Sequence, residues 1–411
     1  MSKTFVGIGF GPIQSGLFLL EAQASGNFER LVVAEVVPEI VSDIRRASGR
    51  YHVNIAEPYG IRTDAIVGLE IYNPRDAADA PKLVDAIAAA DEIATALPSV
   101  DSYRRGNPSP AELLARGFER KLTDGGLPRA VVYAAENHNH AAETLREAVF
   151  ASFDSADGAR LDERAQFANT VIGKMSGVVT DPQQIQRDCL VPLVEGASHA
   201  VLVEQFNRIL ISQITLAGFE RGIDVFQEKP GLLPFEEAKL YGHNAAHALL
   251  GYLANRQGLT LIHEVDSAGL LRFVEQAFVE ESGGALCRRH TGVDPLFTPK
   301  GWAEYVRDLL DRMINPYLRD HISRVIRDPR RKLGWDDRLI GTMRLAIEHD
   351  IAPRRYALGA AAAADLLLRE QPQETVSSLL KGAWGDRADS RSCRTSVINY
   401  ILEAREDLRS R

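Results

Sequence analysis

The chain has 411 residues and a mass of 45.2 kDa, more than one domain of ordinary size, and we expect two domains. With 45% hydrophobic and 25% charged residues, the composition excludes a disordered or fibrous protein. The net charge of −8 argues against a protein that coats nucleic acid or anionic lipid. We therefore expect a small-molecule partner.

The sequence favours a cytoplasmic protein without a membrane partner. Its first residues run directly into a strand-like segment and lack the plan of a signal peptide. The longest apolar tract, residues 357–364, is too short to cross a bilayer. Its three cysteines, Cys189, Cys287 and Cys393, have no Cys-x-x-Cys spacing, which supports neither a disulfide framework nor a structural zinc site.

Up to about residue 205, β-rich apolar runs alternate with helical stretches. This alternation predicts a parallel sheet covered by helices, an α/β domain of the Rossmann type. The predicted strands are residues 4–9, 30–36, 92–96, 129–133 and 200–203, and residues 81–90 are a predicted helix.

After Gly231 the pattern changes to long amphipathic segments, which predict an all-helical region. The predicted helices are residues 235–256, 267–281, 300–314, 335–349, 356–369 and 396–408. A stretch with several glycines and prolines, residues 221–234, is the expected connection. The sequence therefore predicts an α/β domain over residues 1–225 and a mostly α-helical domain over residues 226–411.

A glycine cluster lies between the first predicted strand and an apolar helix. Glycines permit a tight turn and a close approach of backbone N–H groups to a pyrophosphate, and the helix N-terminus adds partial positive charge. The expected contacts with a dinucleotide are Gly9, Phe10, Gly11, Pro12, Ile13 and Gln14. Gln14 replaces the third glycine of G-x-G-x-x-G, and Gly16 follows it. The alternative is that these glycines serve only a tight strand–helix turn.

The strand predicted after this helix ends in Glu35, at the place where an acidic residue can hold ribose hydroxyls. A carboxylate there would also repel a 2′-phosphate. The sequence therefore favours NAD over NADP as the cofactor.

The predicted helix at 235–256 mixes polar groups with core residues. A lysine beside apolar groups loses solvation of its ammonium form, so its pKa falls from about 10.4 toward a range in which it accepts protons. Lys239 is therefore a candidate general base. His243 and His247 have the spacing of two metal ligands, but Asn244 stands where H-E-x-x-H has glutamate, and we favour histidines of the core or surface over zinc.

Two further segments carry polar groups that suit a ligand. Asn137 follows a predicted strand, where its amide could polarise a carbonyl or hydroxyl, or simply close the strand as a turn residue. A basic run near residues 324–332 could be a solvated surface or a corner for an anionic or polyhydroxylated ligand. Its cations are Arg324, Arg327, Arg330, Arg331 and Lys332.

These features resemble the polyol-specific long-chain dehydrogenases, the family of the mannitol-1-phosphate 5-dehydrogenases and mannitol 2-dehydrogenases. The segment Lys239-x4-Asn244-x2-His247 is similar to the family's Lys-x4-Asn-x2-His signature. The turn from Gly9 to Gly16 looks like the family's nucleotide loop, and Asn137 matches its strand-end asparagine. Residues 315–316 and 324–332 resemble the helical segment that contributes to the polyol pocket.

The resemblance implies a zinc-independent hydride transfer between NAD and a secondary alcohol of an open-chain sugar alcohol or its phosphate. Lys239 would be the general base, while Asn137 and Asn244 would hold the substrate oxygen. His247 would hydrogen-bond the substrate or the lysine. The family likeness also permits a monomer.

By the same resemblance, Arg324, Arg327 and Lys332 would line the substrate pocket. One departure concerns the family's Asp-Arg-Ile motif, because Gly173 stands at the place of its acid. Because the same cations could hold a carboxylate, reduction of a uronate such as tagaturonate or fructuronate is an alternative, as is oxidation of unphosphorylated mannitol. An alternative of another class is a dinucleotide-binding sensor without catalysis.

Overall fold

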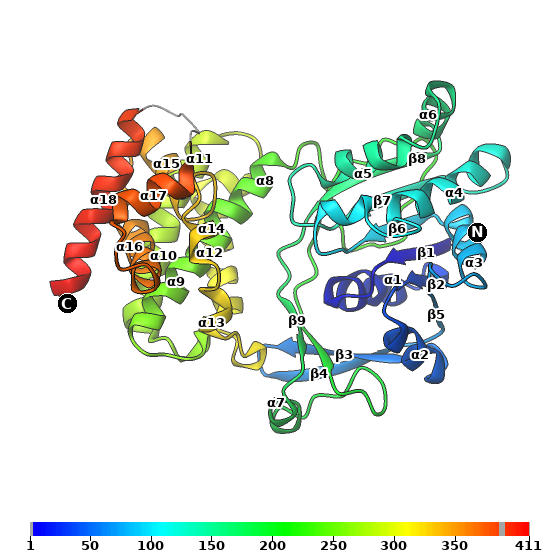
Figure 1. Ribbon diagram of the computed structural model, residues 1–411, viewed down its shortest axis with the longest axis horizontal. Coiled ribbons are helices and arrows are strands. Elements are labelled where there is room, and N and C mark those ends of the chain that lie inside the picture. The colour runs from blue at the N-terminus through cyan, green and yellow to red at the C-terminus, as the bar shows by residue number, and fades with distance from the viewer. Residues whose placement is uncertain (1–2, 386–390, 411) are drawn as a thin grey trace. The chain divides into compact units, whose positions relative to one another are not determined.

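The computed structural model describes residues 3–385 and 391–410. The chain forms two compact units, Met1–Leu232 and Leu233–Arg411, whose elements are labelled in Figure 1. The division falls at residue 232 rather than at the expected 225, because the short strand β12 (Gln227–Lys229) pairs with β11 (Leu210–Ser212) of the first unit.

The first unit is built on a sheet of eight strands in the order β12-β11-β8-β7-β6-β1-β2-β5. Neighbouring strands from β8 to β5 are parallel, and β11 runs antiparallel to β8, so the predicted Rossmann-type sheet is confirmed. The other six strands of this sheet are β1 (Lys3–Ile8), β2 (Phe28–Ala34), β5 (Leu69–Tyr72), β6 (Glu92–Thr95), β7 (Ala130–Ala134) and β8 (Ala165–Val171). The chain reverses its direction of progress across the sheet between β1 and β6, the point at which such sheets bind ligands beyond the carboxyl ends of their strands.

Both faces of this sheet are buried, which the near-continuous apolar run of β1 requires. Phe5 joins one core cluster and Val6 the other, because successive strand residues point to opposite faces. The second cluster is closed by helices α3 to α6. The helical segments of the unit are the π-helical turn η1 (Gln14–Phe18), which continues into α1 (Leu19–Ser25), then α2 (Pro38–Arg46), α3 (Ala80–Ala89), the 3₁₀ turn η2 (Val100–Arg104), α4 (Pro110–Thr123), α5 (Ala141–Phe150), α6 (Ser155–Asp162) and α7 (Pro182–Arg187).

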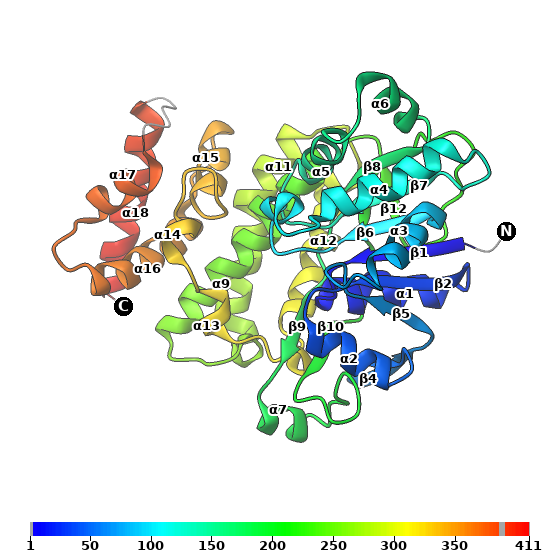
Figure 2. The same cartoon turned by 45° about the vertical axis from the view of Figure 1, so that its right-hand side comes forward.

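A second, four-stranded sheet lies in the same unit and was not predicted. Its strands are β4 (Gly60–Ile66), β3 (Tyr51–Glu57), β10 (Ala200–Glu204) and β9 (Ser176–Val179), in that order, and β9 and β10 lie side by side in Figure 2. The strand predicted at 200–203 therefore belongs to this sheet, where it pairs with β3. Gly16 lets the sheet approach the first helix, since a Cβ at Gly16 would lie 2.5 Å from Cγ1 of Val203.

The second unit is helical in the described residues, as predicted. Its first helical run comprises α8 (Leu233–Glu237), the π-helical turn η3 (Ala238–His243) and α9 (Asn244–Arg256). The remaining helical segments are η4 (Ile262–Glu264), η5 (Ser267–Leu271), α10 (Arg272–Gln276), η6 (Ala277–Gly283), α11 (Gly284–Arg289), η7 (Pro295–Phe297), α12 (Pro299–Met313), η8 (Pro316–Leu318), α13 (Ile322–Val325), α14 (Pro329–Lys332), α15 (Ile340–Glu348), α16 (Arg354–Glu370), α17 (Val376–Trp384) and α18 (Arg391–Ser410).

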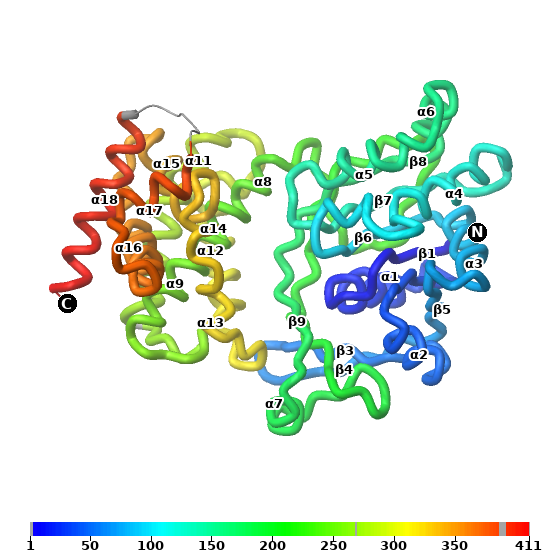
Figure 3. Tube along the Cα trace, in the orientation of Figure 1, coloured from blue at the N-terminus to red at the C-terminus, as the bar shows by residue number. Residues whose placement is uncertain are grey.

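The helices α9 and α16 form the centre of this unit. Small residues bring them together, since a Cβ at Gly359 would lie 2.8 Å from Cδ1 of Leu249, and the alanines from 360 to 364 are buried. The last helix, α18, runs along α16 (Figure 3) and begins five residues before the predicted Ser396. Among the helices of the described residues, none combines the length and apolar character that crossing a bilayer requires.

Candidate active site

The glycine turn after β1 has the backbone that a phosphate-binding loop needs. Gly9 adopts φ +88°, a left-handed conformation that favours glycine, and its N–H donates to the carbonyl of Ala34 at 2.9 Å. A Cβ at Gly9 would lie 3.0 Å from the carbonyl oxygen of Ala96. At Gly11, by contrast, a Cβ would meet nothing within 4 Å, which leaves the backbone open to a ligand. The turn therefore fits the pyrophosphate of a dinucleotide.

Gln14, which the sequence places among the cofactor contacts, has a fully buried side chain under the turn. It faces Gly7, where a Cβ would lie 2.3 Å from Nε2 of Gln14. The absence of a side chain at Gly7 thus makes room for a large residue where the usual motif has glycine. Neither amide atom of Gln14 has a hydrogen-bond partner in the described part of the chain.

Glu35 lies directly after β2 and is buried, with both carboxylate oxygens engaged. Oε2 accepts from the backbone N–H of Phe10 at 2.9 Å, while Oε1 accepts from the N–H groups of Val36 and Val37 at 2.7 and 2.8 Å. A carboxylate offers about four acceptor positions, so about one remains for a ribose hydroxyl. Glu35 therefore fixes the glycine turn, and its role in holding a ribose hydroxyl stays a prediction.

Asn137 follows β7 at the same edge of the sheet and its side chain is exposed. Its neighbour Glu136 is buried and holds this edge together. The carboxylate of Glu136 accepts from the hydroxyl of Thr95 and the N–H of Leu97, both at 2.9 Å, and from the hydroxyl of Tyr103. Burial raises the pKa of Glu136 above its usual value, although these donors oppose the shift.

In the second unit, the π-helical turn η3 aligns Lys239 and Asn244 along one side of the helix. The backbone N–H of Asn244 donates to the carbonyl of Lys239, five residues earlier, instead of to the residue four earlier as in an α-helix. The signature spacing Lys-x4-Asn therefore places both residues on one column of the helix. Both side chains are half-buried. Single π turns of this kind often occur at functional sites.

The environment of Lys239 favours its neutral form. Burial lowers the pKa of Lys239 from 10.5 to about 8, the positive charge of Arg338 adds to this effect, and Glu236 opposes it. His243, one turn along, is buried, and burial together with the charges of His247 and Arg312 holds its pKa well below 6.5. Within the described residues, no group of three or more His, Cys, Asp or Glu side chains is arranged to hold a metal ion.

His247 meets a carboxylate that the sequence did not single out. Its Nε2 lies 2.8 Å from Oδ2 of Asp320, and the other oxygen of Asp320 accepts from Nε and an Nη of Arg324 at 2.8 and 2.6 Å. One acid thus contacts two residues of the predicted site. Its position four residues before Arg324 was the available sequence signal, because acid and arginine at this spacing pair on a helical turn.

The basic run does not form a single cationic corner. Arg324 and Arg327 are exposed, whereas Lys332 is buried and donates to the backbone carbonyl of Arg327. Burial lowers the pKa of Lys332 to about 8, and Arg338 and Arg331 add to the shift.

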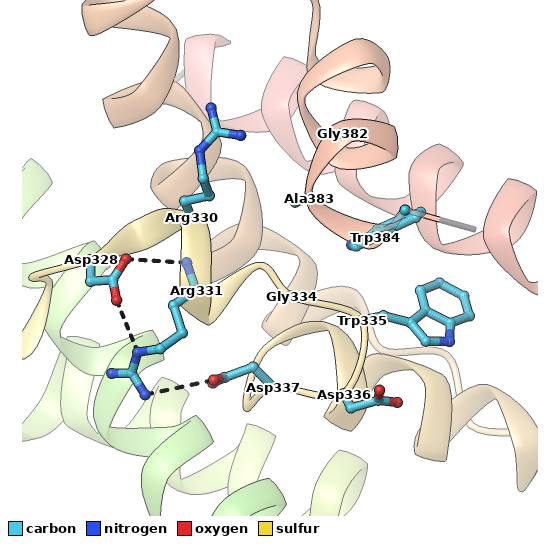
Figure 4. A pocket seen from close by; sticks show the side chains of 11 residues that line it. Asp328, Arg330, Arg331, Gly334, Trp335, Asp336, Asp337, Gly382, Ala383 and Trp384 are labelled. Atoms are coloured by element: carbon cyan, nitrogen blue, oxygen red, sulfur yellow. Dashed lines mark hydrogen bonds and ion pairs between the residues drawn. The ribbon is translucent and has the colours of Figure 1, made fainter. Parts of the chain in front are cut away.

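A cavity of about 810 Å³ lies in the second unit beside the end of this run (Figure 4). Its charged lining is mixed, since Arg331 bonds Asp328 at 2.9 Å and lies 3.7 Å from Asp337. The indole rings of Trp335 and Trp384 are buried, and their centroids lie 4.8 Å apart. The lining residues are Asp328, Arg330, Arg331, Gly334, Trp335, Asp336, Asp337, Gly382, Ala383, Trp384 and Gly385.

Comparisons with known proteins find relatives that share one enzyme name. The chain is 27% identical over 343 residues to a mannitol-1-phosphate 5-dehydrogenase of Talaromyces marneffei, covering 83% of this chain and 80% of that protein. It is 28% identical over 344 residues to a Bacillus licheniformis protein of the same name, covering 84% and 83%.

Two solved structures share the fold. A substrate-free D-sorbitol dehydrogenase has a TM-score of 0.75 at 15% identity, covering 99% of this chain and 94% of that one. The Pseudomonas fluorescens mannitol 2-dehydrogenase, solved with NAD and D-mannitol, has a TM-score of 0.67 at 16% identity, covering 100% and 92%. Residues 231–381 match the family described as the mannitol dehydrogenase C-terminal domain. The match over residues 231–381 and the two relatives confirm the resemblance to the polyol-specific long-chain dehydrogenases.

Proposed function

We propose that this chain is an NAD-dependent oxidoreductase that interconverts an open-chain sugar alcohol, or its phosphate, with the corresponding ketose. The names of its relatives support the substrate class. The observation that carries the chemistry is Lys239, a half-buried lysine with a pKa near 8, held in register with Asn244 by the π turn.

NAD, when bound, supplies the hydride acceptor, and the chain supplies the proton chemistry and the geometry. With a pKa near 8, about half of the Lys239 amines are neutral at pH 8, so the side chain can take the proton of a substrate hydroxyl. The amide of Asn244, on the same column of the helix, would hold the substrate oxygen and stabilise negative charge that develops on it. His247 would orient the substrate by hydrogen bonding.

The first unit would hold the cofactor. The open backbone at Gly11 suits the pyrophosphate, and Glu35 stands where a ribose hydroxyl would bind. Asn137, exposed at the carboxyl edge of the same sheet, has an amide that can polarise a carbonyl or hydroxyl oxygen.

The substrate's anionic group, if it has one, would meet the guanidinium groups of Arg324 and Arg327, which are exposed. We favour mannitol 1-phosphate, because both relatives with 27–28% identity carry that enzyme name. Unphosphorylated mannitol and a uronate such as tagaturonate are the alternatives.

The test is a panel of sugar alcohols, their phosphates and the matching ketoses and uronates, followed by NADH absorbance. We expect turnover with mannitol 1-phosphate or a related polyol, and at least a hundredfold loss of kcat in Lys239→Ala. Lys300→Ala, which removes an exposed lysine of the same unit, should leave turnover unchanged. No turnover across the panel, or full activity in Lys239→Ala, would overturn the proposal. NADH binding without turnover would instead point to a sensor.

A further inference from the structure

We propose that Asp320 is a positioning residue of the active site, which holds the imidazole of His247 and the guanidinium of Arg324 with the two oxygens of one carboxylate. The inference deepens the proposed function and rests on it, because His247 and Arg324 act on the substrate in that proposal. Asp320 itself is assigned no contact with substrate.

Each carboxylate oxygen of Asp320 contacts a different partner. Oδ1 takes two hydrogen bonds from Arg324, whose guanidinium is otherwise exposed, and Oδ2 lies 2.8 Å from Nε2 of His247. At that distance the imidazole and the carboxylate form an ion pair when the ring is protonated, although the ring geometry is not that of a regular hydrogen bond. Nδ1 is then the ring nitrogen left for the substrate.

Asp320 is buried, with 6% of its surface exposed, yet it keeps its charge. Burial raises the pKa of Asp320, but His247 and Arg324 outweigh burial and bring the pKa below 3.8. A buried carboxylate that stays ionised between two nitrogen donors is a fixed negative charge at neutral pH. It can therefore orient both partners throughout the pH range in which Lys239 titrates.

The backbone around Asp320 is also held in place. Arg319 adopts φ +46°, a left-handed conformation that is unusual for arginine and turns the chain just before the acid. The carbonyl of Asp320 accepts from the N–H of Ile262 at 2.9 Å, and the N–H of Ile322 donates to Thr260 at 2.9 Å. These bonds tie the segment to the loop that follows α9.

Close helix packing then brings the acid to the histidine. Gly251 of α9 lets Val325 of α13 approach, because a Cβ at Gly251 would lie 2.6 Å from Cγ1 of Val325. The hydroxyl of Tyr252 also donates to the carbonyl of Ile326 at 3.1 Å. The helix that carries His247 and the segment that carries Asp320 are therefore one packed body within this unit.

The experiment compares Asp320→Asn, which keeps the side-chain shape and removes the charge, with the wild-type chain. We expect kcat/KM for the polyol to fall at least about tenfold, while KM for NAD stays within about twofold. Asp365→Asn is the matched control, since Asp365 also accepts from an arginine, Arg405, at 2.6 Å in the same unit. It should leave the kinetic constants unchanged.

A double-mutant cycle with His247→Asn separates positioning from a general loss of structure. Because the part of the loss that runs through His247 is already absent there, Asp320→Asn should cost at least about threefold less in the His247→Asn background than in the wild-type chain. Additive losses, or a folded Asp320→Asn chain with kcat and polyol KM within twofold of wild type, would overturn the inference.

The proposed function and this inference fail in different ways. A wild-type chain that turns over no polyol defeats the proposed function, and thermal unfolding of the same cycle then tests the contact alone. If the double variant is no less stable than the less stable of the two single variants, Asp320 stabilises the chain through its contact with His247. Additive losses of stability overturn the inference.

Discussion

The carboxylate of Glu35 and the backbone N–H of Phe10 are joined by a buried hydrogen bond of 2.9 Å. This bond ties the end of β2 to the middle of the glycine turn after β1, so the residue expected to read the ribose also holds the loop expected to bind the pyrophosphate. Any change at Glu35 should therefore affect cofactor binding in two ways.

We expect Glu35→Gln to raise KM for NAD at least about tenfold and to weaken discrimination against NADP. The glutamine places an amide N–H₂ against backbone N–H donors and removes the charge that repels a 2′-phosphate. Steady-state kinetics with both cofactors would measure this. Glu39→Gln, which removes an exposed charge four residues further on, is the control. A Glu35→Gln chain with an unchanged KM for NAD would contradict the role.

The pKa of Lys239 predicts opposite pH profiles for the two directions of the reaction. Because burial lowers this pKa to about 8, the neutral amine that oxidation requires becomes the major form above pH 8. The rate of polyol oxidation should therefore rise with pH, reach half its limit near pH 8 and level off about one pH unit higher, while ketose reduction, which needs the ammonium form, should fall over the same range. Lys239→Arg should abolish both, because the arginine side chain neither accepts nor releases a proton in this pH range. Profiles without a transition between pH 7 and 9 would refute the assignment.

The buried amide of Gln14 predicts a stabilising substitution. A buried polar group without a partner costs about 1–3 kcal/mol, so Gln14→Leu should increase the free energy of unfolding by about that amount. Gln23 of α1, the helix that continues from the π-helical turn η1 with Gln14, is a matched control. Its amide donates to the carbonyl of Ala65 at 2.8 Å and accepts from the N–H of Val67 at 2.7 Å, so Gln23→Leu should lower stability. Denaturant unfolding of both variants would measure the contrast, and a loss of stability in Gln14→Leu would indicate a bound water there.

The raised pKa of Glu92 predicts that the free energy of unfolding falls as pH rises toward 7. Burial raises its pKa from 4.5 to about 7, against the opposing donors Gly222 and Tyr133. Because the folded-state pKa is the higher one, the stabilisation is complete below pH 4.5 and is lost as pH rises through about 7. The shift corresponds to about 3 kcal/mol.

The amide of Glu92→Gln has no proton to lose, so this variant avoids the buried charge that the wild-type chain acquires. The unfolding temperature of Glu92→Gln minus that of the wild-type chain should therefore rise between pH 5 and pH 8. Glu70 of β5 serves as the control. Its hydrogen bond to Arg30 lowers its pKa, so Glu70→Gln should show no such trend in that window. Equal pH trends in the Glu92→Gln and wild-type chains would rule out this origin.

Several parts of the fold and site could be predicted because the signal lies in neighbouring residues. The apolar run of β1, the glycines at 9 and 11 and the 3.6-residue periodicity after residue 233 each report a local preference of the backbone. The spacing of Lys239 and Asn244 belongs to this group as well. The sequence marked the pair, although the π turn that brings them into register was visible only in the structure.

By itself the sequence determined the order of an α/β unit and a helical unit, the glycine turn, and the lysine, amide and histidine of one helix. The tertiary structure alone decided the second sheet, in which β10 pairs with β3, and the contact between Asp320 and His247. It also decided that Gly7 accommodates Gln14. The reason is physical: local periodicity is written in adjacent residues, whereas pairing between distant segments depends on how whole elements pack, and no short stretch of sequence records that.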